Sequence, residues 1–240
     1  MKPKMILFDY GHTLLWERDF DFERGYAAVF EHVCKNPNAV TSKDMNELAE
    51  GLFREADICR RQGMELHEFP LLRCASEALG IEFDIPIEEA ENILWTNSSA
   101  GGKMPHIDAL LTHLKSEGIR TGVISNIGWS GGALKRRIER LLPESDFEFI
   151  LTSSEYGIRK PNPLLFRIAL QKAGLEPNEV WFCGDNIAAD IVGAHGAGMF
   201  PVYYDCAKDK DMNAKSDMLP DFEYLHVNDW LELIDTLKER

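Results

Sequence analysis

The sequence lacks any apolar run of the length that crosses a membrane, which takes about 18 or more consecutive residues. Its first segment, MKPKMILFDY, has only the short apolar block from Met5 to Phe8 before an aspartate. A secretion signal needs a longer hydrophobic region. We therefore expect neither a transmembrane helix nor a signal peptide, and a cytoplasmic protein.

Cysteine and histidine are too sparse and too scattered for a structural metal site. The seven histidines form no H-x-H or H-E-x-x-H pattern, so zinc is not indicated. The cysteines are odd in number and include no C-x-x-C pair, which argues against a disulfide framework. They are Cys34, Cys59, Cys74, Cys183 and Cys206.

Basic residues are outnumbered, with 26 Lys and Arg against 40 Asp and Glu and a net charge of -14. Such a surface repels nucleic acid and anionic lipid, so neither is an expected partner. Any phosphorylated ligand must be held by local donors. The hydrophobic content of 45% is enough for an ordinary globular core.

Continuous apolar blocks are the clearest structural signal in the chain. Unbroken runs of this kind are typical of strands that are covered on both faces, as in a parallel sheet. Helical spacing separates the later blocks, as in Leu134, Ile138 and Leu141. We predict an α/β domain with a doubly wound, mostly parallel, Rossmann-like sheet, built from residues 1–15 and 104–240. Its strands are expected at 5–9, 120–126, 147–153, 179–185, 199–204 and 222–227.

Residues 16–103 interrupt this rhythm. They contain no convincing strand, and helical patterns lie around 20–35, 42–61, 68–79 and 86–95. We predict an inserted, all-helical cap domain over 16–103, with the segment SSAGG as the hinge by which the chain returns to the sheet.

Polar side chains stand where several of the predicted strands end. Ligands of open α/β sheets bind beyond these carboxyl ends. Carboxylates with open coordination suit Mg²⁺, and an aspartate beside a metal and a lysine is a plausible nucleophile. The residues concerned are Asp9, Ser125, Asn126, Asp185, Asn186 and Asp190, with Lys160 in the segment after the third strand.

In order, the segments FDYGHTL, VISN, GIRKPNP and GDNIAADIVGAHGAGM resemble the four motifs of the haloacid dehalogenase superfamily. The resemblance covers 1–15 and about 104–240, and the helical insertion is similar to the family's small cap between motifs one and two. It implies a Mg²⁺-dependent hydrolase, a phosphatase acting on a small phosphorylated metabolite through an aspartyl phosphate. The protein is expected to be a monomer or a homodimer.

Roles carried over from the family fall on matching positions of this sequence. The resemblance implies that Asp9 attacks phosphorus and binds the metal with Asp185 and the carbonyl of Gly11. It implies that Lys160 neutralises Asp9 and the transferring group. Ser125 and Asn126 would hold phosphoryl oxygens or the loop around them, together with Lys160. Asp190 and Asn186 would support the metal site from outside its ligands, with Asp190 orienting Lys160 or a metal-bound water.

The first motif departs from the family pattern. Where the family's phosphatases have a second aspartate as general acid and base, this chain has Gly11, and the glycine expected next is His12. His12 has a suitable ordinary pKa of about 6.5 and is a candidate surrogate. The alternative is that His12 serves only as a loop contact.

Three alternatives stay open because of Gly11. The first is a weak or inactive member of the family that binds a ligand or another protein. The second is a dehalogenase, which would need a tyrosine at position 11, whereas Tyr10 lies one residue early. The third is a phosphonate hydrolase that uses a cap lysine, for which only Lys35 and Lys43 are available before the hinge lysine Lys103. The pair Arg60 and Arg61 fits the end of a helix better than a substrate contact.

Restoring the missing acid in Gly11→Asp should raise the turnover of alkyl phosphates by up to about 100-fold, and that of aryl phosphates by less. An alkoxide leaving group needs a proton, whereas a phenolate does not. Steady-state kinetics on a matched alkyl and aryl pair measure the difference. An equal gain on both, or none, would contradict this account.

Overall fold

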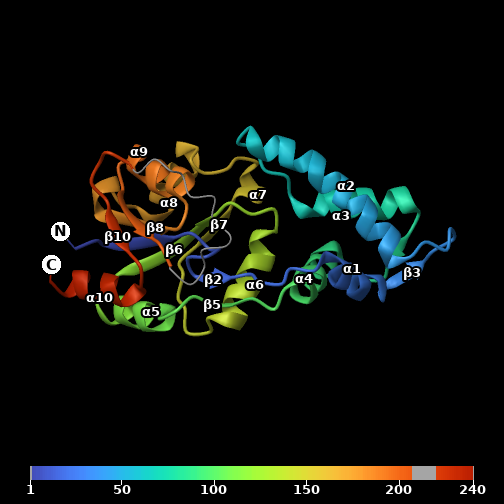
Figure 1. The fold of residues 1–240 in the computed structure, drawn as a ribbon, viewed down its shortest axis with the longest axis horizontal. Helices are drawn as coiled ribbons and strands as arrows, with labels where there is room; N and C mark the ends of the chain where they lie inside the picture. Colours follow the sequence, from blue (N-terminus) through green and yellow to red (C-terminus); the bar gives the residue numbers. More distant parts are fainter. Residues whose placement is uncertain (1, 207–219, 240) are drawn as a thin grey trace.

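The computed structural model describes residues 2–206 and 220–239, and its centre is a six-stranded parallel sheet (Figure 1). The strand order β10-β9-β8-β1-β6-β7 confirms the predicted doubly wound topology. The strands are β1 (Met5–Phe8), β6 (Arg120–Ser125), β7 (Ile150–Thr152), β8 (Val180–Gly184), β9 (Phe200–Tyr204) and β10 (Leu225–Val227).

Helices cover both faces of this sheet because successive side chains of its central strands, which point to opposite faces, are apolar. Ile6 and Phe8 of β1 pack into the larger of the two main cores, beneath α5 (Ile107–Ser116), α6 (Gly131–Leu141) and α10 (Trp230–Lys238). Met5 and Leu7 pack into the other, with α8 (Pro163–Ala173) and α9 (Gly193–Gly196). These two groups of helices lie on opposite sides of the sheet in Figure 1. The short elements α7 (Ser153–Tyr156), η1 (Pro177–Glu179) and η2 (Ile187–Val192) complete the domain.

The insertion folds as helices α1 (Phe22–Phe30), α2 (Ser42–Arg61), α3 (Glu68–Leu79) and α4 (Ile87–Ser98), which lie together beyond one end of the sheet (Figure 1). Its helix ends follow local chemistry. A capping box of Thr41 and Asp44 begins α2, and Gly80, with φ of 72°, ends α3 in the left-handed conformation. In the described residues no helix is long and apolar enough to span a membrane.

The insertion is not all-helical, so this part of the prediction is wrong. The first helix ends at Phe30, and β3 (Val33–Lys35) pairs antiparallel with β4 (Glu82–Phe83). The sequence signal for β4 was the alternation of Ile81, Phe83 and Ile85, all of which pack into the core. Strands of two or three residues are too short for that alternation to stand out.

A second small ribbon marks the two crossings between the sheet domain and the insertion. Leu15 and Trp16 form β2, which pairs antiparallel with β5 (Gly102–Lys103). The predicted boundaries fall on this ribbon. Gly102 leaves room for the Trp16 ring, because a Cβ there would lie 2.2 Å from a ring carbon.

Two buried acids of the insertion, Glu91 and Glu68, lie near its contact with the sheet domain. Glu91 of α4 accepts hydrogen bonds from the backbone N and Oγ of Ser130, the residue that caps α6. The backbone N of Glu68 donates to the carbonyl of Gly128 at 2.9 Å. The Glu68 side chain is buried, and its Oε1 has no hydrogen-bond partner among the described residues. Burial, and then the nearby Glu91 carboxylate, raise the pKa of Glu68 from 4.5 to about 8.

The free energy of unfolding should therefore fall as pH rises from about 5 to about 8, by at most about 1.4 kcal/mol per pH unit for this one group. In that range folded Glu68 keeps a proton that the unfolded chain releases, so rising pH favours unfolding. Glu68→Gln should flatten the dependence, whereas Glu77→Gln, on the exposed side of α3, should not. Urea denaturation between pH 5 and pH 8 measures the slopes, and an unchanged slope in Glu68→Gln would contradict the assignment.

Candidate active site

The carboxyl ends of β8, β1 and β6 lie side by side and open into a cavity of about 510 Å³. Asp9 follows β1, and its backbone N donates to the carbonyl of Cys183 in β8 at 2.9 Å. All of the predicted site residues line this cavity, so the topology brings together side chains that are far apart in sequence. They are Asp9, Gly11, His12, Ser125, Asn126, Lys160, Asp185, Asn186 and Asp190.

Lys160 links two of the carboxylates at the base of the cavity. Its Nζ lies 2.6 Å from Oδ1 of Asp9 and 2.7 Å from Oδ1 of Asp190, and it donates to the carbonyl of Ile124 at 2.8 Å. Burial alone would lower the pKa of Lys160, but Asp190 and then Asp9 raise it above its ordinary value. The side chain therefore stays an ammonium ion between two carboxylates.

Asp190 reaches Lys160 because the end of β8 has no side chain in its path. A Cβ on Gly184 would lie 2.4 Å from the Asp190 Cγ, which no real structure tolerates. The other carboxylate oxygen of Asp190 accepts from the backbone N of Asn186 at 3.1 Å. Burial raises the pKa of Asp190, against the opposing effect of the Lys160 charge.

Asn126 holds the backbone on which Lys160 stands. Its Nδ2 donates to the Lys160 carbonyl at 2.9 Å, and its Oδ1 accepts from the Lys160 backbone N at 2.7 Å. Of the two roles expected for Asn126, these bonds favour the one of shaping the loop. Ser125, at the end of β6, is buried beside it and lines the cavity.

Three carboxylates come close enough to share a cation. Asp9, Asp185 and Asp190 each offer one oxygen, and these oxygens all lie within 4.8 Å of one another. This donor set fits Mg²⁺, which prefers oxygen ligands and keeps several waters. Asp190 is the least available of the three because it is buried against Lys160. The metal site itself stays a prediction.

The loop after Asp9 has room for a side chain at position 11, where this sequence has glycine. A Cβ at Gly11 would have no described atom within 4 Å, and this glycine does not have a positive φ. His12 has φ of 53°, in the left-handed region that favours glycine and is more often occupied by Asn, Asp and His than by other residues. His12 thus places an imidazole at a backbone position whose conformation favours glycine.

A polar network beside the loop that follows Asp9 was not predicted from the sequence. The Tyr10 hydroxyl donates to Glu17 at 2.5 Å and accepts from Nε of Arg137 at 2.9 Å. The indole of Trp95 donates to both Glu17 oxygens at 3.1 Å. Nothing in the sequence links these four positions, which come from the loop, the first crossing, α4 and α6. Because the Tyr10 hydroxyl is held in this network and buried, the structure does not favour a dehalogenase tyrosine.

The lysines and arginines of the insertion that were considered from the sequence are not among the described residues that line the cavity. Lys35 pairs with Glu82, Lys43 with Glu47 and Lys103 with Asp108, and none of these lysines is among the described residues that line the cavity. A Schiff-base lysine is therefore not favoured. Arg60 and Arg61 end α2, as predicted, and pair with Glu65 and Asp57.

Comparison with known proteins identifies the family. Residues 77–203, just over half of the chain, match the model of the haloacid dehalogenase-like hydrolases. The chain is 33% identical to a glyceraldehyde 3-phosphate phosphatase of Methanopyrus kandleri, over 98% of this chain and 97% of that protein. The chain belongs to the haloacid dehalogenase-like hydrolase family.

Solved structures of this hydrolase family share the fold. A 2-haloacid dehalogenase from Pseudomonas syringae has a TM-score of 0.61 at 22% identity, with 99% of both chains covered. A phosphatase of the family from Thermococcus onnurineus has a TM-score of 0.61 at 19% identity, with 99% of this chain and 98% of that chain covered. At these identities the likeness concerns the fold, and the chemistry must be argued from the residues.

Gly184→Ala should lower the free energy of unfolding by about 1–3 kcal/mol, because the new methyl group displaces Asp190. Gly11→Ala is the matched control, since its Cβ meets open space, and it should change the stability by less than about 1 kcal/mol. Urea denaturation of both variants measures the difference. Equal stabilities would show that Asp190 can move without cost.

Proposed function

We propose that the protein is a Mg²⁺-dependent phosphatase that forms an aspartyl phosphate on Asp9. The observation that carries this proposal is the position of Lys160, whose ammonium group lies between Asp9 and Asp190. It pairs with the Asp9 carboxylate, the proposed nucleophile, and it places a positive charge where a phosphoryl group would meet that carboxylate. Phosphoryl transfer depends mainly on positioning and on charge stabilisation of this kind.

The other residues have roles that follow from their contacts. Asn126 fixes the Lys160 backbone, and Asp190 fixes its side chain. Ser125 lies at the end of the strand beside β1, within the same cavity, where its hydroxyl is available for a phosphoryl oxygen.

Asp9, Asp185 and the Gly11 carbonyl would hold the metal. When bound, Mg²⁺ supplies positive charge to the phosphoryl oxygens and reduces the repulsion between the phosphate and the cavity's carboxylates. The excess of carboxylates over cations among the lining residues supports a divalent cation for binding an anionic substrate.

The loop lacks a carboxylic acid to protonate the leaving group. Proton transfer from a placed side chain is typically worth about 10²- to 10⁴-fold. We therefore expect fast reaction with aryl and acyl phosphates and slower reaction with alkyl phosphates, unless His12 takes that role. The imidazole lines the cavity one residue after Gly11, which makes it the candidate within the loop.

The substrate is proposed to be a small phosphorylated metabolite. The relative from Methanopyrus kandleri is named for glyceraldehyde 3-phosphate, a three-carbon phosphate. A cavity of about 510 Å³ holds a molecule of that size together with a metal ion and waters.

The test is turnover of p-nitrophenyl phosphate by the native protein and by Asp9→Asn, with Mg²⁺ and with a chelator. We expect Mg²⁺-dependent turnover that falls to background in Asp9→Asn, because the amide cannot attack phosphorus. Asp57→Asn, on the exposed side of α2, is the control and should keep full activity.

A native protein that shows no difference from Asp9→Asn with Mg²⁺ present would favour the rival function. That rival is a weak or inactive family member that binds a ligand or a protein, and Gly11 is the feature that supports it. The choice between them depends on this comparison and not on the fold.

A further inference from the structure

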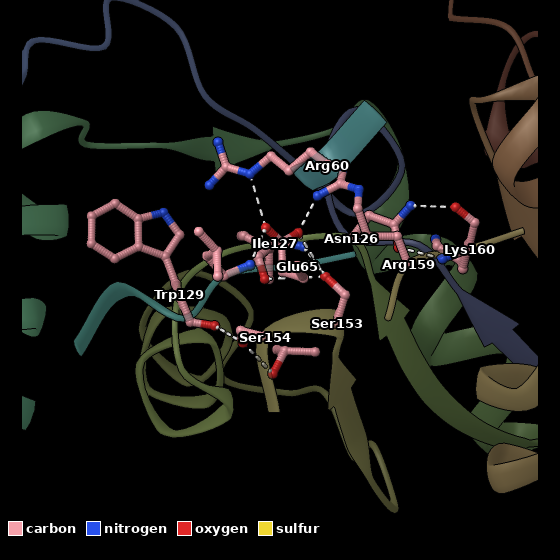
Figure 2. A network of polar contacts seen from close by, with 11 residues as sticks. Arg60, Glu65, Asn126, Ile127, Trp129, Ser153, Ser154, Arg159 and Lys160 are labelled. Atoms are coloured by element: carbon pink, nitrogen blue, oxygen red, sulfur yellow. Dashed lines mark hydrogen bonds and ion pairs between the residues drawn. The ribbon is translucent and has the colours of Figure 1, made fainter. Parts of the chain in front are cut away.

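One loop of the insertion enters the sheet domain and buries a carboxylate there. The loop joins α2 to α3, and its Glu65 side chain is fully buried (Figure 2). Oε1 of Glu65 accepts from Nε of Arg60 at 2.8 Å, within the insertion. Oε2 accepts from the Ser153 hydroxyl at 2.9 Å and pairs with Nη1 of Arg159, both of the sheet domain.

Backbone bonds fix the same loop. The backbone N of Glu65 donates to the Gly157 carbonyl at 3.1 Å, and the backbone N of Arg159 donates to the Gly63 carbonyl at 3.0 Å. Met64 and Ile158 form an antiparallel bridge between these bonds. The segment just before Lys160 is therefore paired with the insertion on both its backbone and its side chains.

Arg159 and Ser153, the two partners of Glu65 Oε2, are each connected to a loop that carries a proposed site residue. Arg159 is bonded covalently to Lys160. The Ser153 hydroxyl oxygen accepts from the backbone N of Ile127 at 2.9 Å, and Ile127 follows Asn126.

Since Asn126 clamps the Lys160 backbone, these contacts form a closed ring. It runs through Glu65, Arg159, Lys160, Asn126, Ile127 and Ser153, and returns to Glu65. Figure 2 shows these residues together.

We propose that Glu65 is a positioning residue for Lys160, and that it makes the geometry of the catalytic lysine depend on the docked insertion. This inference rests on the proposed function. Glu65 is not among the described residues that line the cavity, and it acts through Arg159 and Ser153. Simple fastening of the insertion would not need a carboxylate, because apolar contacts do that as well without the cost of burying charge.

The kinetic test uses Glu65→Gln, which has the same shape without the charge. It also uses Ser153→Ala, which removes only the hydroxyl that links Glu65 to Ile127. The control is Arg61→Ala, at the end of α2 just before the loop that carries Glu65, where the side chain is exposed and pairs with Asp57. Turnover is measured with Mg²⁺ on p-nitrophenyl phosphate and on the much smaller acetyl phosphate.

We expect Glu65→Gln to lower kcat by about 10- to 100-fold on both substrates, with KM changed far less, because Lys160 is displaced in both reactions. Ser153→Ala should give a smaller loss. The double variant should lose less than the product of the two single effects, as residues of one network do. Arg61→Ala should match the native protein. A loss confined to the larger substrate would assign Glu65 to substrate enclosure and overturn the proposal.

Amide hydrogen exchange gives a readout without catalysis. Glu65→Gln should speed exchange in residues 157–160 and 126–128 of the sheet domain, relative to Arg61→Ala. Faster exchange confined to residues 42–79 would mean that only the insertion has loosened, and would contradict positioning. If the native protein has no phosphatase activity, the proposed function fails, and the exchange result still decides whether Glu65 holds the Lys160 segment.

Discussion

The contact on which the site depends is the buried ammonium group of Lys160 between Asp9 and Asp190. Two carboxylates with oxygens within 4.8 Å of one another repel, on the order of 4 kcal/mol at that range in the partly polar interior of a protein. The Lys160 ammonium group between them offsets that repulsion and gives each carboxylate an ion-pair partner. Because all three groups come from different segments, the contact also fixes how β1, β8 and the loop after β7 meet.

Several features of the chain position Lys160 and Asp190 for this contact. Gly184 leaves the space through which Asp190 reaches the lysine, and Asn126 binds both backbone groups of Lys160. Such dedicated support is typical of sites whose groups must be held within a fraction of an ångström. The insertion adds a third support at Glu65, so the lysine is held by both parts of the chain. This explains why the loop between α2 and α3 is polar at its buried tip.

Strands and helices with a continuous apolar or periodic pattern were predicted from the sequence, and short elements without such a pattern were missed. Buried strands such as β1 and β8 are unbroken apolar blocks, and their parallel order brings Asp9 and Asp185 to one edge of the sheet. Lys160 carries no such signal: only its position after the third predicted strand marked it as a candidate, and its role was implied by the resemblance to a family motif. The ribbon of β3 and β4 was missed because its strands are too short to show a period.

Contacts between distant segments were missed for a different reason. Glu65 and Arg159 are 94 positions apart, and Tyr10 and Arg137 are 127 apart. From the sequence alone, the three charged residues would be predicted to lie on the surface, and Tyr10 would be predicted to lie in the core. Arg60 was placed correctly at a helix end, but the sequence does not show that the loop after α2 turns Glu65, five positions on, back onto it.

The loop after Asp9 holds His12 in an uncommon backbone conformation beside Gly11. A turn that requires a left-handed residue keeps that conformation at His12, although a side chain other than glycine costs about 1–2 kcal/mol there. The turn is held by the bond from the His12 backbone N to the Leu15 carbonyl at 2.8 Å. A glycine at position 12 would avoid that cost and remove the imidazole from the cavity that it lines. Strain kept at the mouth of a reactive site, beside open space at Gly11, therefore points to a use for the side chain that bears it.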